Sequence, residues 1–289
     1  MSNWHAISWW VLRIGGFEIL EYTMKPLVTD ALWERIEPLL PPPPPRRFRF
    51  PGRKHIDQRK VLTGILFVLK TGIAWDDLPS DMGCGCGKTC RHYLRLWHQA
   101  GVWLKLHALL LAELNSADQI DWERALIDAS FAKAPEGGED TGPNPTDRRK
   151  SGSKHHVLTD AQGVPLNATT TAANVNEVTQ ALKVLVTAPP VGGKPGPKRQ
   201  LPERLQGDRG FDSEPLRVVL RWLGITPILA KRNTEHGSGL GVKRWFVERT
   251  ISWLHSFGRL RRRLDRLVEI QDAFLRLGCS MVCLGFLTT

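Results

Sequence analysis

The chain has 289 residues, a hydrophobic share of 42% and a formal net charge of +11. These values favour a globular protein of two domains, or of one large domain with an appendage, and exclude global disorder. No apolar run in the sequence reaches the roughly 18 residues that span a bilayer, so we expect no membrane partner. Five cysteines lack the spacing of a secreted disulfide scaffold, which favours a reducing, cytoplasmic location.

The positive charge is concentrated in three blocks. Residues 46–60 carry seven basic residues and one acid, residues 146–154 carry four and one, and residues 231–266 carry ten and three. Such blocks are typical of proteins that bind a polyanion, most simply double-stranded DNA. The alternative is that they are solvated faces that only keep the protein soluble.

Residues 1–23 are apolar, but they lack the basic start and small-residue cleavage site of a signal peptide. Met24 precedes the first stretch with clear helix signals. An upstream start choice would explain residues 1–23 as a leader.

Four helices are predicted within residues 24–118. Thr29 and Asp30 open the first, Asp57 caps the second and Gly72 ends it, and residues 88–99 and 102–114 form the last two. A helix, a turn and a basic helix are typical of a helix-turn-helix, so we expect this region to bind DNA, although a plain helical bundle fits too. The expected DNA contacts here are Arg46, Arg47, Arg49, Arg53, Lys54, Lys88, Arg91 and Arg95.

The pattern changes to alternating strands and helices in residues 119–289. Residues 124–134 are apolar on both faces, which predicts a central strand, and a hairpin is predicted around residues 160–163. Strands at residues 204–207 and 225–230 alternate with helices, and the last predicted helix covers residues 245–259. This order predicts an α/β fold, with a mixed five-stranded sheet, flanking helices and an all-α region before it.

Three acids have positions that are compatible with one site. Asp128 lies in the predicted central strand, Asp208 directly follows another strand, and Glu248 borders the packed face of a later helix. Converging carboxylates repel one another, and two divalent cations such as Mg²⁺ or Mn²⁺ would remove that penalty. A two-metal site activates an attacking water or hydroxyl at a phosphodiester, which fits a basic protein. An ordinary surface Glu paired with an Arg is the simpler interpretation of Glu248.

The sequence resembles the DDE transposases of bacterial insertion sequences, specifically insertion-sequence family five, from residue 24 to about 287. The resemblance rests on LWERI (32–36), TGIAW (71–75) with LP (78–79), IDAS (127–130), GSKHH (152–156), GDRGFDS (207–213) and RWFVERT (244–250) running into WL (253–254). It implies an RNase H-like catalytic core, with Asp128, Asp208 and Glu248 as catalytic residues and metal ligands for two Mg²⁺ or Mn²⁺ ions. It also implies an N-terminal helical region that binds DNA.

The resemblance extends to Arg244, which matches the arginine of the family's signature helix. Two positions depart from the pattern, because Gly241 stands where a tyrosine is expected and His255 where a lysine or arginine is frequent. Both departures concern DNA positioning rather than metal binding. The DNA contacts expected in residues 119–289 are Arg148, Arg149, Lys150, Lys154, Arg209, Arg244, Arg249, His255, Arg259, Arg261, Arg262 and Arg263.

The implied activity is cleavage of DNA at the element's ends, followed by attack of the freed 3′-hydroxyl on target DNA. Pairing of two ends suggests a homodimer or higher oligomer on DNA. Two alternatives stay open: a nuclease of the same fold that cuts without joining strands, and a catalytically decayed copy that only binds the element as a repressor.

Overall fold

The computed structural model describes residues 26–42, 45, 48–49, 54–232 and 241–288, without the side chains of residues 241–243. The expectations for residues 1–23, Arg46, Arg47 and Arg53 lie outside the described residues.

Among the described residues before the sheet are four helices and three short 3₁₀ turns: α1 (Asp30–Ile36), η1 (Glu37–Leu39), α2 (Gln58–Thr71), η2 (Trp75–Asp77), η3 (Ser80–Met82), α3 (Gly87–Gln99) and α4 (Val102–Ser116). The predicted helix ends are confirmed. Thr29 accepts a hydrogen bond from the Leu32 backbone N–H, and Asp57 accepts one from Lys60, so each caps its helix. Gly72 ends α2 with φ of 81°, a left-handed conformation that glycine adopts without strain.

The sheet is mixed, as predicted. Its strands are β1 (Arg124–Lys133), β2 (Gly142–Pro143), β3 (Ser151–Asp160), β4 (Pro165–Ala172), β5 (Arg204–Gly207) and β6 (Thr226–Leu229). β1 is central: it pairs antiparallel with β3 and parallel with β5, while β4 and β2 pair with β3 and β6 with β5. The sequence predicts five of these strands, and the two-residue β2 is an addition.

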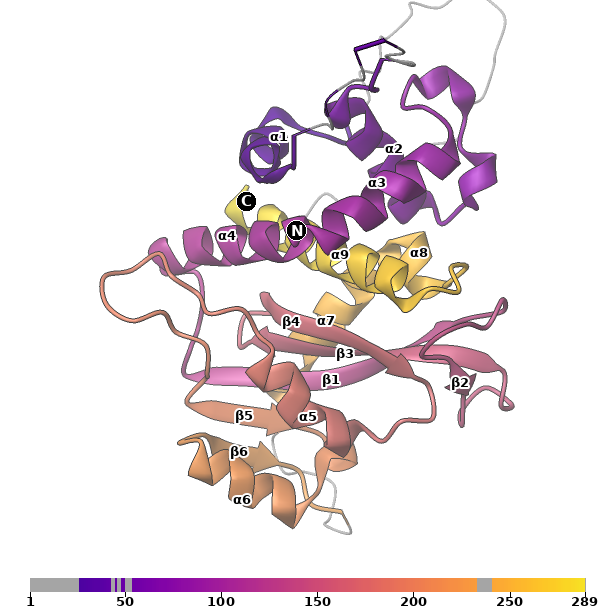
Figure 1. Ribbon diagram of the computed structural model, residues 1–289. Helices are drawn as coiled ribbons and strands as arrows, with labels where there is room; N and C mark the ends of the chain where they lie inside the picture. Colours follow the sequence, from indigo (N-terminus) through magenta and orange to yellow (C-terminus); the bar gives the residue numbers. More distant parts are fainter. Residues whose placement is uncertain (1–25, 43–44, 46–47, 50–53, 233–240, 289) are drawn as a thin grey trace, which may run out of the picture.

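The remaining helices are α5 (Glu177–Val186), α6 (Glu214–Trp222), α7 (Gly241–Ser256), α8 (Gly258–Arg261) and α9 (Val268–Leu287), with the turn η4 (Arg209–Phe211) before α6. Figure 1 shows α5 in front of the sheet and α7 behind it. α9 contacts α4, α3 and β4, so it joins the N-terminal helices to the sheet. The predicted α/β class with helices on both faces is therefore confirmed.

By length and composition, α9 is long and apolar enough to cross a membrane. It contains polar residues, so it does not stand out in the sequence as an uninterrupted apolar run. Its most apolar window is 67% buried inside the protein, and its buried residues belong to the same hydrophobic core as those of α4 and β4. That position is typical of the core helix of a globular protein.

The predicted helix over residues 245–259 breaks before its end. α7 ends at Ser256 and α8 starts at Gly258. Gly258 lies against Gly72, and a Cβ atom built on Gly258 would be 2.7 Å from the Gly72 Cα. Two glycines therefore let α2 and α8 approach closely. The break places Arg259 on a different helix from Glu248, contrary to the prediction of one helix over residues 245–259.

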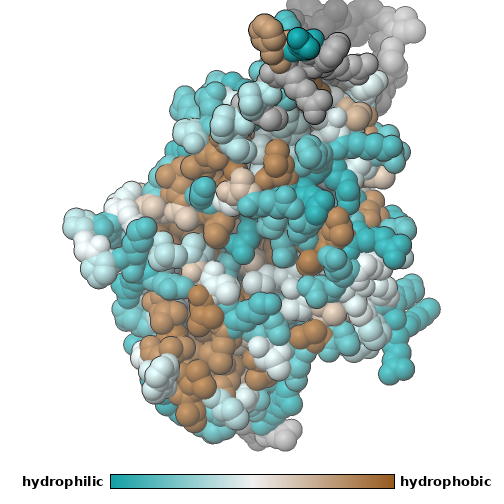
Figure 2. All heavy atoms as spheres, in the orientation of Figure 1, coloured by the Kyte–Doolittle hydropathy of each residue, from teal (hydrophilic) through white to brown (hydrophobic). Residues whose placement is uncertain are grey.

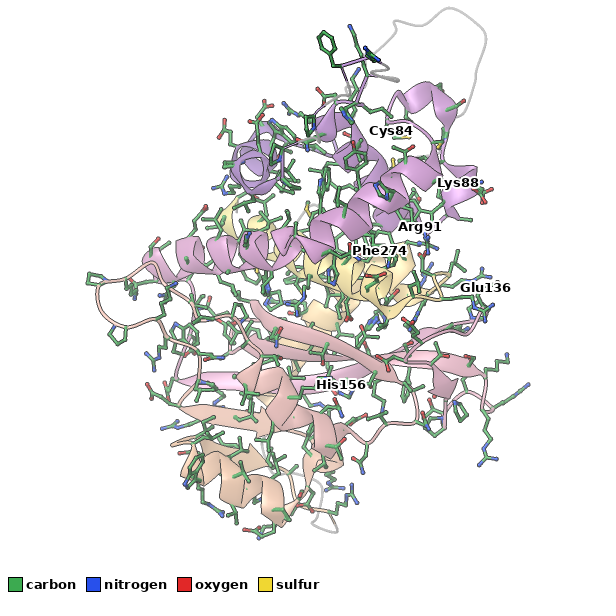
Figure 3. All side chains as sticks on the ribbon, in the orientation of Figure 1. Cys84, Lys88, Arg91, Glu136, His156 and Phe274 are labelled. Atoms are coloured by element: carbon green, nitrogen blue, oxygen red, sulfur yellow. The ribbon has the colours of Figure 1, made fainter. Side chains whose placement is uncertain are left out.

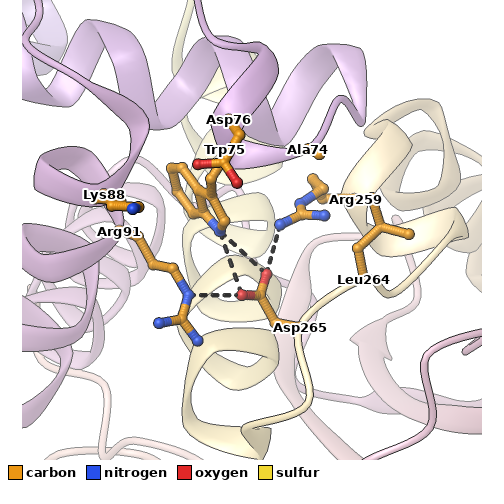
Figure 4. A pocket seen from close by; sticks show the side chains of 8 residues that line it. All are labelled: Ala74, Trp75, Asp76, Lys88, Arg91, Arg259, Leu264 and Asp265. Atoms are coloured by element: carbon orange, nitrogen blue, oxygen red, sulfur yellow. Dashed lines mark hydrogen bonds and ion pairs between the residues drawn. The ribbon is translucent and has the colours of Figure 1, made fainter.

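The carboxylate of Asp265 joins the N-terminal helices to the C-terminal ones. It accepts a hydrogen bond from Arg91 Nε of α3 at 2.9 Å and one from Arg259 Nη2 of α8 at 2.5 Å, and Trp75 Nε1 lies 3.3 Å from both its oxygens. Figure 4 shows these side chains around a pocket of about 320 Å³. Arg259 also lies over the stacked rings of Trp75 and Phe274, so a buried ion pair holds this boundary together.

We expect Asp265→Asn to lower the free energy of unfolding by about 3 kcal/mol, because it leaves the buried Arg259 without an opposite charge. Asp118→Asn is the control, since Asp118 pairs with Lys194 at an exposed site and its loss should cost less than about 0.5 kcal/mol. Urea unfolding measures both. Equal losses would show that the Asp265 pair has no special role.

Candidate active site

Strand register brings Asp128 and Asp208 together. In the parallel pair of β1 and β5, Ile127 is opposite Gly207, and the next residue of each chain segment is one of these two acids. Neighbouring strands lie about 4.8 Å apart, so the two aspartates start from adjacent backbone positions. The predicted approach of these two positions is a direct result of the parallel pairing.

Backbone N–H groups orient both aspartates in the same way. Asp128 Oδ1 accepts a hydrogen bond from the Ala129 N–H, and Asp208 Oδ1 accepts one from the Gly210 N–H, each at 2.8 Å. A Cβ atom on Gly210 would lie 2.8 Å from Asp208 Oδ1 and 2.7 Å from Glu177 Oε2. Glycine at this position therefore leaves room for two carboxylates, and Oδ2 of each aspartate faces Arg244.

Arg244 connects the two aspartates with Glu248. Its Nη2 lies 3.4 Å from Asp128 Oδ2 and 3.5 Å from Asp208 Oδ2, and its Nε lies 3.3 Å from Glu248 Oε1. Arg244 and Glu248 are one helical turn apart on α7, which contacts β1 and β3. All three predicted catalytic acids thus contact a single guanidinium group.

The electrostatics of the site reflect this arrangement. Burial raises the pKa of Asp128 to about 6, and the Asp208 charge adds to that rise, while the Ala129 N–H and Arg244 oppose it. Burial alone would lower the pKa of Arg244, but the charges of the three acids outweigh it and raise that pKa. The guanidinium therefore acts as the countercharge of the cluster.

The donor chemistry suits a hard divalent cation, because every acidic side chain here offers carboxylate oxygens. Within the described ranges, however, no three acidic, histidine or cysteine side chains are close enough to hold one ion together. The ion pairs to Arg244 are longer than the 2.7–2.9 Å typical of tight charge-assisted hydrogen bonds. As placed, the three acids have Arg244 as their countercharge, and their oxygens are of the kind that a hard divalent cation binds.

The predicted DNA-binding side chains that the structure describes fall into three groups by exposure. One group is exposed: Arg49, Lys54, Lys88, Arg95, Arg148, Arg149, Lys150, Arg261 and Arg262. Arg91, Arg209, Arg244, Arg249 and His255 are half-buried. In α3, Arg91 pairs with Asp265 and Arg95 with Glu269, so part of the basic face of this helix is directed at the start of α9. Figure 3 labels Lys88 and Arg91 on α3 and Phe274 on α9.

Three predicted DNA-binding residues are instead buried. Arg259 is paired with Asp265, and Arg263 donates to the Asp265 carbonyl and to Ser153 Oγ, each at 2.8 Å. Lys154 pairs with Glu177 at 3.1 Å and lies over the Phe131 ring. As placed, these side chains are buried and bonded to internal partners, so DNA contact by them stays a prediction.

Two residues near these sites were not predicted from the sequence. Glu177 lies beside the Asp208 turn, and its only sequence signal is the cap residue Asn176 before it, which marks an ordinary helix start. Asp265 interrupts a strongly basic segment. Its isolation among basic residues is the signal in the sequence that Asp265 neutralises buried arginines.

Comparison with known proteins identifies the family of this chain. Residues 28–107 match the family model described as "Putative transposase of IS4/5 family", and residues 123–283 match "Transposase DDE domain". A Burkholderia cepacia protein described as "Putative transposase for insertion sequence element IS402" is 57% identical over 143 residues, which are 50% of this chain and 68% of that protein. A second IS402 protein of the same organism, described as uncharacterized, is 57% identical over 121 residues, 42% of this chain and 82% of its own length.

Among solved structures, the Mos1 strand transfer complex matches 84% of this chain and 79% of its own, with 9% identity and a TM-score of 0.29. The similarity is too low to support an argument about function. The DDE model covers more than half of the chain, and the IS402 relative is matched over more than two thirds of its length. The chain therefore belongs to the DDE transposases of bacterial insertion sequences, in the group that the IS4/5 family model describes.

Proposed function

We propose that this protein cuts DNA at the ends of its element by metal-dependent phosphodiester hydrolysis and then joins the 3′-hydroxyl to target DNA. The observation that carries the proposal is the convergence of Asp128, Asp208 and Glu248 on one guanidinium in a chain of this family. A buried strand, a turn and a covering helix supply one acid each. Three acids from separate elements are hard to explain as ordinary surface ion pairs.

Asp128, Asp208 and Glu248 would hold two Mg²⁺ or Mn²⁺ ions. When bound, these ions would supply an activated water or hydroxyl and stabilise the leaving oxygen. The backbone N–H groups of Ala129 and Gly210 hold the two aspartates in a fixed orientation. Glu248 is the most exposed of the three acids, with 55% of its side chain accessible, so it has the freedom to move inward.

Double-stranded DNA is the proposed partner. Arg244 would turn from the carboxylates to a DNA phosphate, and the exposed basic side chains would hold the duplex: Lys88, Arg148, Arg149, Lys150, Arg261 and Arg262. We assign DNA binding to residues 24–118 together with these positions, and catalysis to residues 119–289. Two copies would be needed to hold two ends.

Asp128→Asn should abolish cleavage by at least about 10³-fold and leave the affinity for DNA nearly unchanged, because it keeps the side-chain shape and removes a ligand charge. Glu203→Gln is the control, since Glu203 is an exposed acid just before β5. The assay is a nicked-product gel with element-end duplex and target DNA in Mg²⁺. Normal cleavage by Asp128→Asn would rule out the proposed site.

The same assay separates the three functions. Joined product identifies a transposase, cleavage without joining identifies a nuclease, and metal-independent binding without cleavage identifies a repressor.

Arg244→Gln should increase stabilisation by Mn²⁺, since the cation no longer competes with a guanidinium for the three carboxylates. In EDTA the melting temperature of the variant should lie a few degrees below that of the wild type. Each kcal/mol of lost stability lowers it by about 2–4 °C. In Mn²⁺ its melting temperature should rise more than that of the wild type. Arg249→Gln is the matched control, one turn along α7 but stacked over Trp245 and Trp253. Equal Mn²⁺ shifts in the wild type and in Arg244→Gln would contradict this role.

The raised pKa of Asp128 predicts a pH dependence of stability. In the unfolded chain this carboxyl loses its proton near pH 4, whereas in the folded protein it keeps it until about pH 6. The folded state therefore loses stability as the pH rises from about 4 to about 6. Urea unfolding in EDTA should show this decline in the wild type relative to Asp128→Asn. Parallel pH profiles would mean that Asp128 has an ordinary pKa.

A further inference from the structure

α6 has two apolar faces, only one of which packs inside the protein. Leu216 and Leu220 are buried. On the outer side, Pro215, Val218, Val219 and Trp222 follow the spacing of a single helix face, and all four are exposed. Of the last three, 56%, 36% and 83% of the residue surface is accessible, in that order.

An apolar outer face is unusual, because the outward side of a surface helix is normally polar. Figure 2 shows hydrophobic surface gathered at the lower end of the molecule, where Figure 1 places α6 and β6. β6 is the last strand of the sheet path, so α6 stands at its edge. Contiguous apolar surface of this kind marks a docking site.

The charges beside this face indicate what occupies it. Glu214 and Arg221 lie at opposite ends of α6 and form an ion pair at 3.2 Å. If two α6 helices meet antiparallel, with Val218 at the centre, Glu214 of each copy faces the end that carries Arg221 in the other. A parallel pair would place like charges together. A DNA backbone is a poor fit, because the outer face carries no net positive charge.

We propose that a second copy of this chain docks on this face, with the two α6 helices antiparallel about a two-fold axis near Val218 and Trp222 as the main anchor. Trp222 suits that role, because a large exposed aromatic side chain that becomes buried in an interface contributes strongly to affinity. The inference depends on the folded surface and not on the proposed chemistry.

Light scattering after size exclusion tests the proposal. The wild type should dimerise, and Trp222→Ala and Val218→Glu should each weaken dimerisation by about 30-fold or more. Val186→Glu is the matched control, because Val186 on α5 is 54% exposed and lies outside the α6 face. Circular dichroism and melting temperature would show that each variant is folded. The proposal is overturned if the wild type stays monomeric at its highest soluble concentration. It is also overturned if the monomer binds another protein in place of a second copy.

Cross-linking tests the geometry independently. In a Cys86→Ser background, which removes the exposed native thiol, Val218→Cys should form a disulfide-linked dimer with oxidised glutathione, which is reduced as the two thiols are oxidised. Val186→Cys should cross-link at least 10-fold less. Equal cross-linking of both variants, or dimerisation that Val218→Glu leaves unchanged, would overturn the antiparallel α6 interface.

Discussion

Three ionised carboxylates at the end of a sheet repel one another, and a positive charge between them offsets that repulsion. The parallel pairing of β1 with β5 forces Asp128 and Asp208 into adjacent positions, and α7 brings Glu248 over them. The same helix supplies Arg244 one turn earlier, so the acid and its countercharge arrive on one element. The folded protein therefore holds the three acids with the Arg244 guanidinium between them as their countercharge.

This internal cation links metal binding and DNA binding in the proposed chemistry. Divalent ions would compete with Arg244 for carboxylate oxygens, whereas a DNA phosphate would compete with the carboxylates for Arg244. Each ligand thus lowers the cost of binding the other, which is a coupling between two binding events. The long ion-pair distances at Arg244 suit a group that exchanges partners, because little hydrogen-bond energy is lost when it leaves.

Local signals predicted most of the fold. Thr29, Asp57 and Gly72 mark helix ends through their own backbone and side-chain chemistry. Apolar residues on both faces identified β1, and the turn at residues 160–163 identified the hairpin. The site was predictable because strand order determines which residues become neighbours. The burial of Arg259 and Arg263 was not predictable, because it depends on the break at Gly258 and on Asp265. The periodicity of a sequence carries no information about a tertiary ion pair. Arg244 was predicted as a DNA contact, and its position among the acids required the structure.

The burial of Arg259 and Arg263 changes how the basic charge of the chain should be interpreted. A basic block on the sequence combines charges that hold the fold together with charges that face solvent. Here Asp265 separates them: Arg259 and Arg263 bond to it and support the boundary with α3, while Arg261 and Arg262, between them in the chain, stay exposed. Because Arg91 belongs to the same network, a duplex that contacts α3 also contacts the element that fixes α8 and α9. DNA binding at the helical region would thus act on a support of α8 and α9, rather than on a separate module.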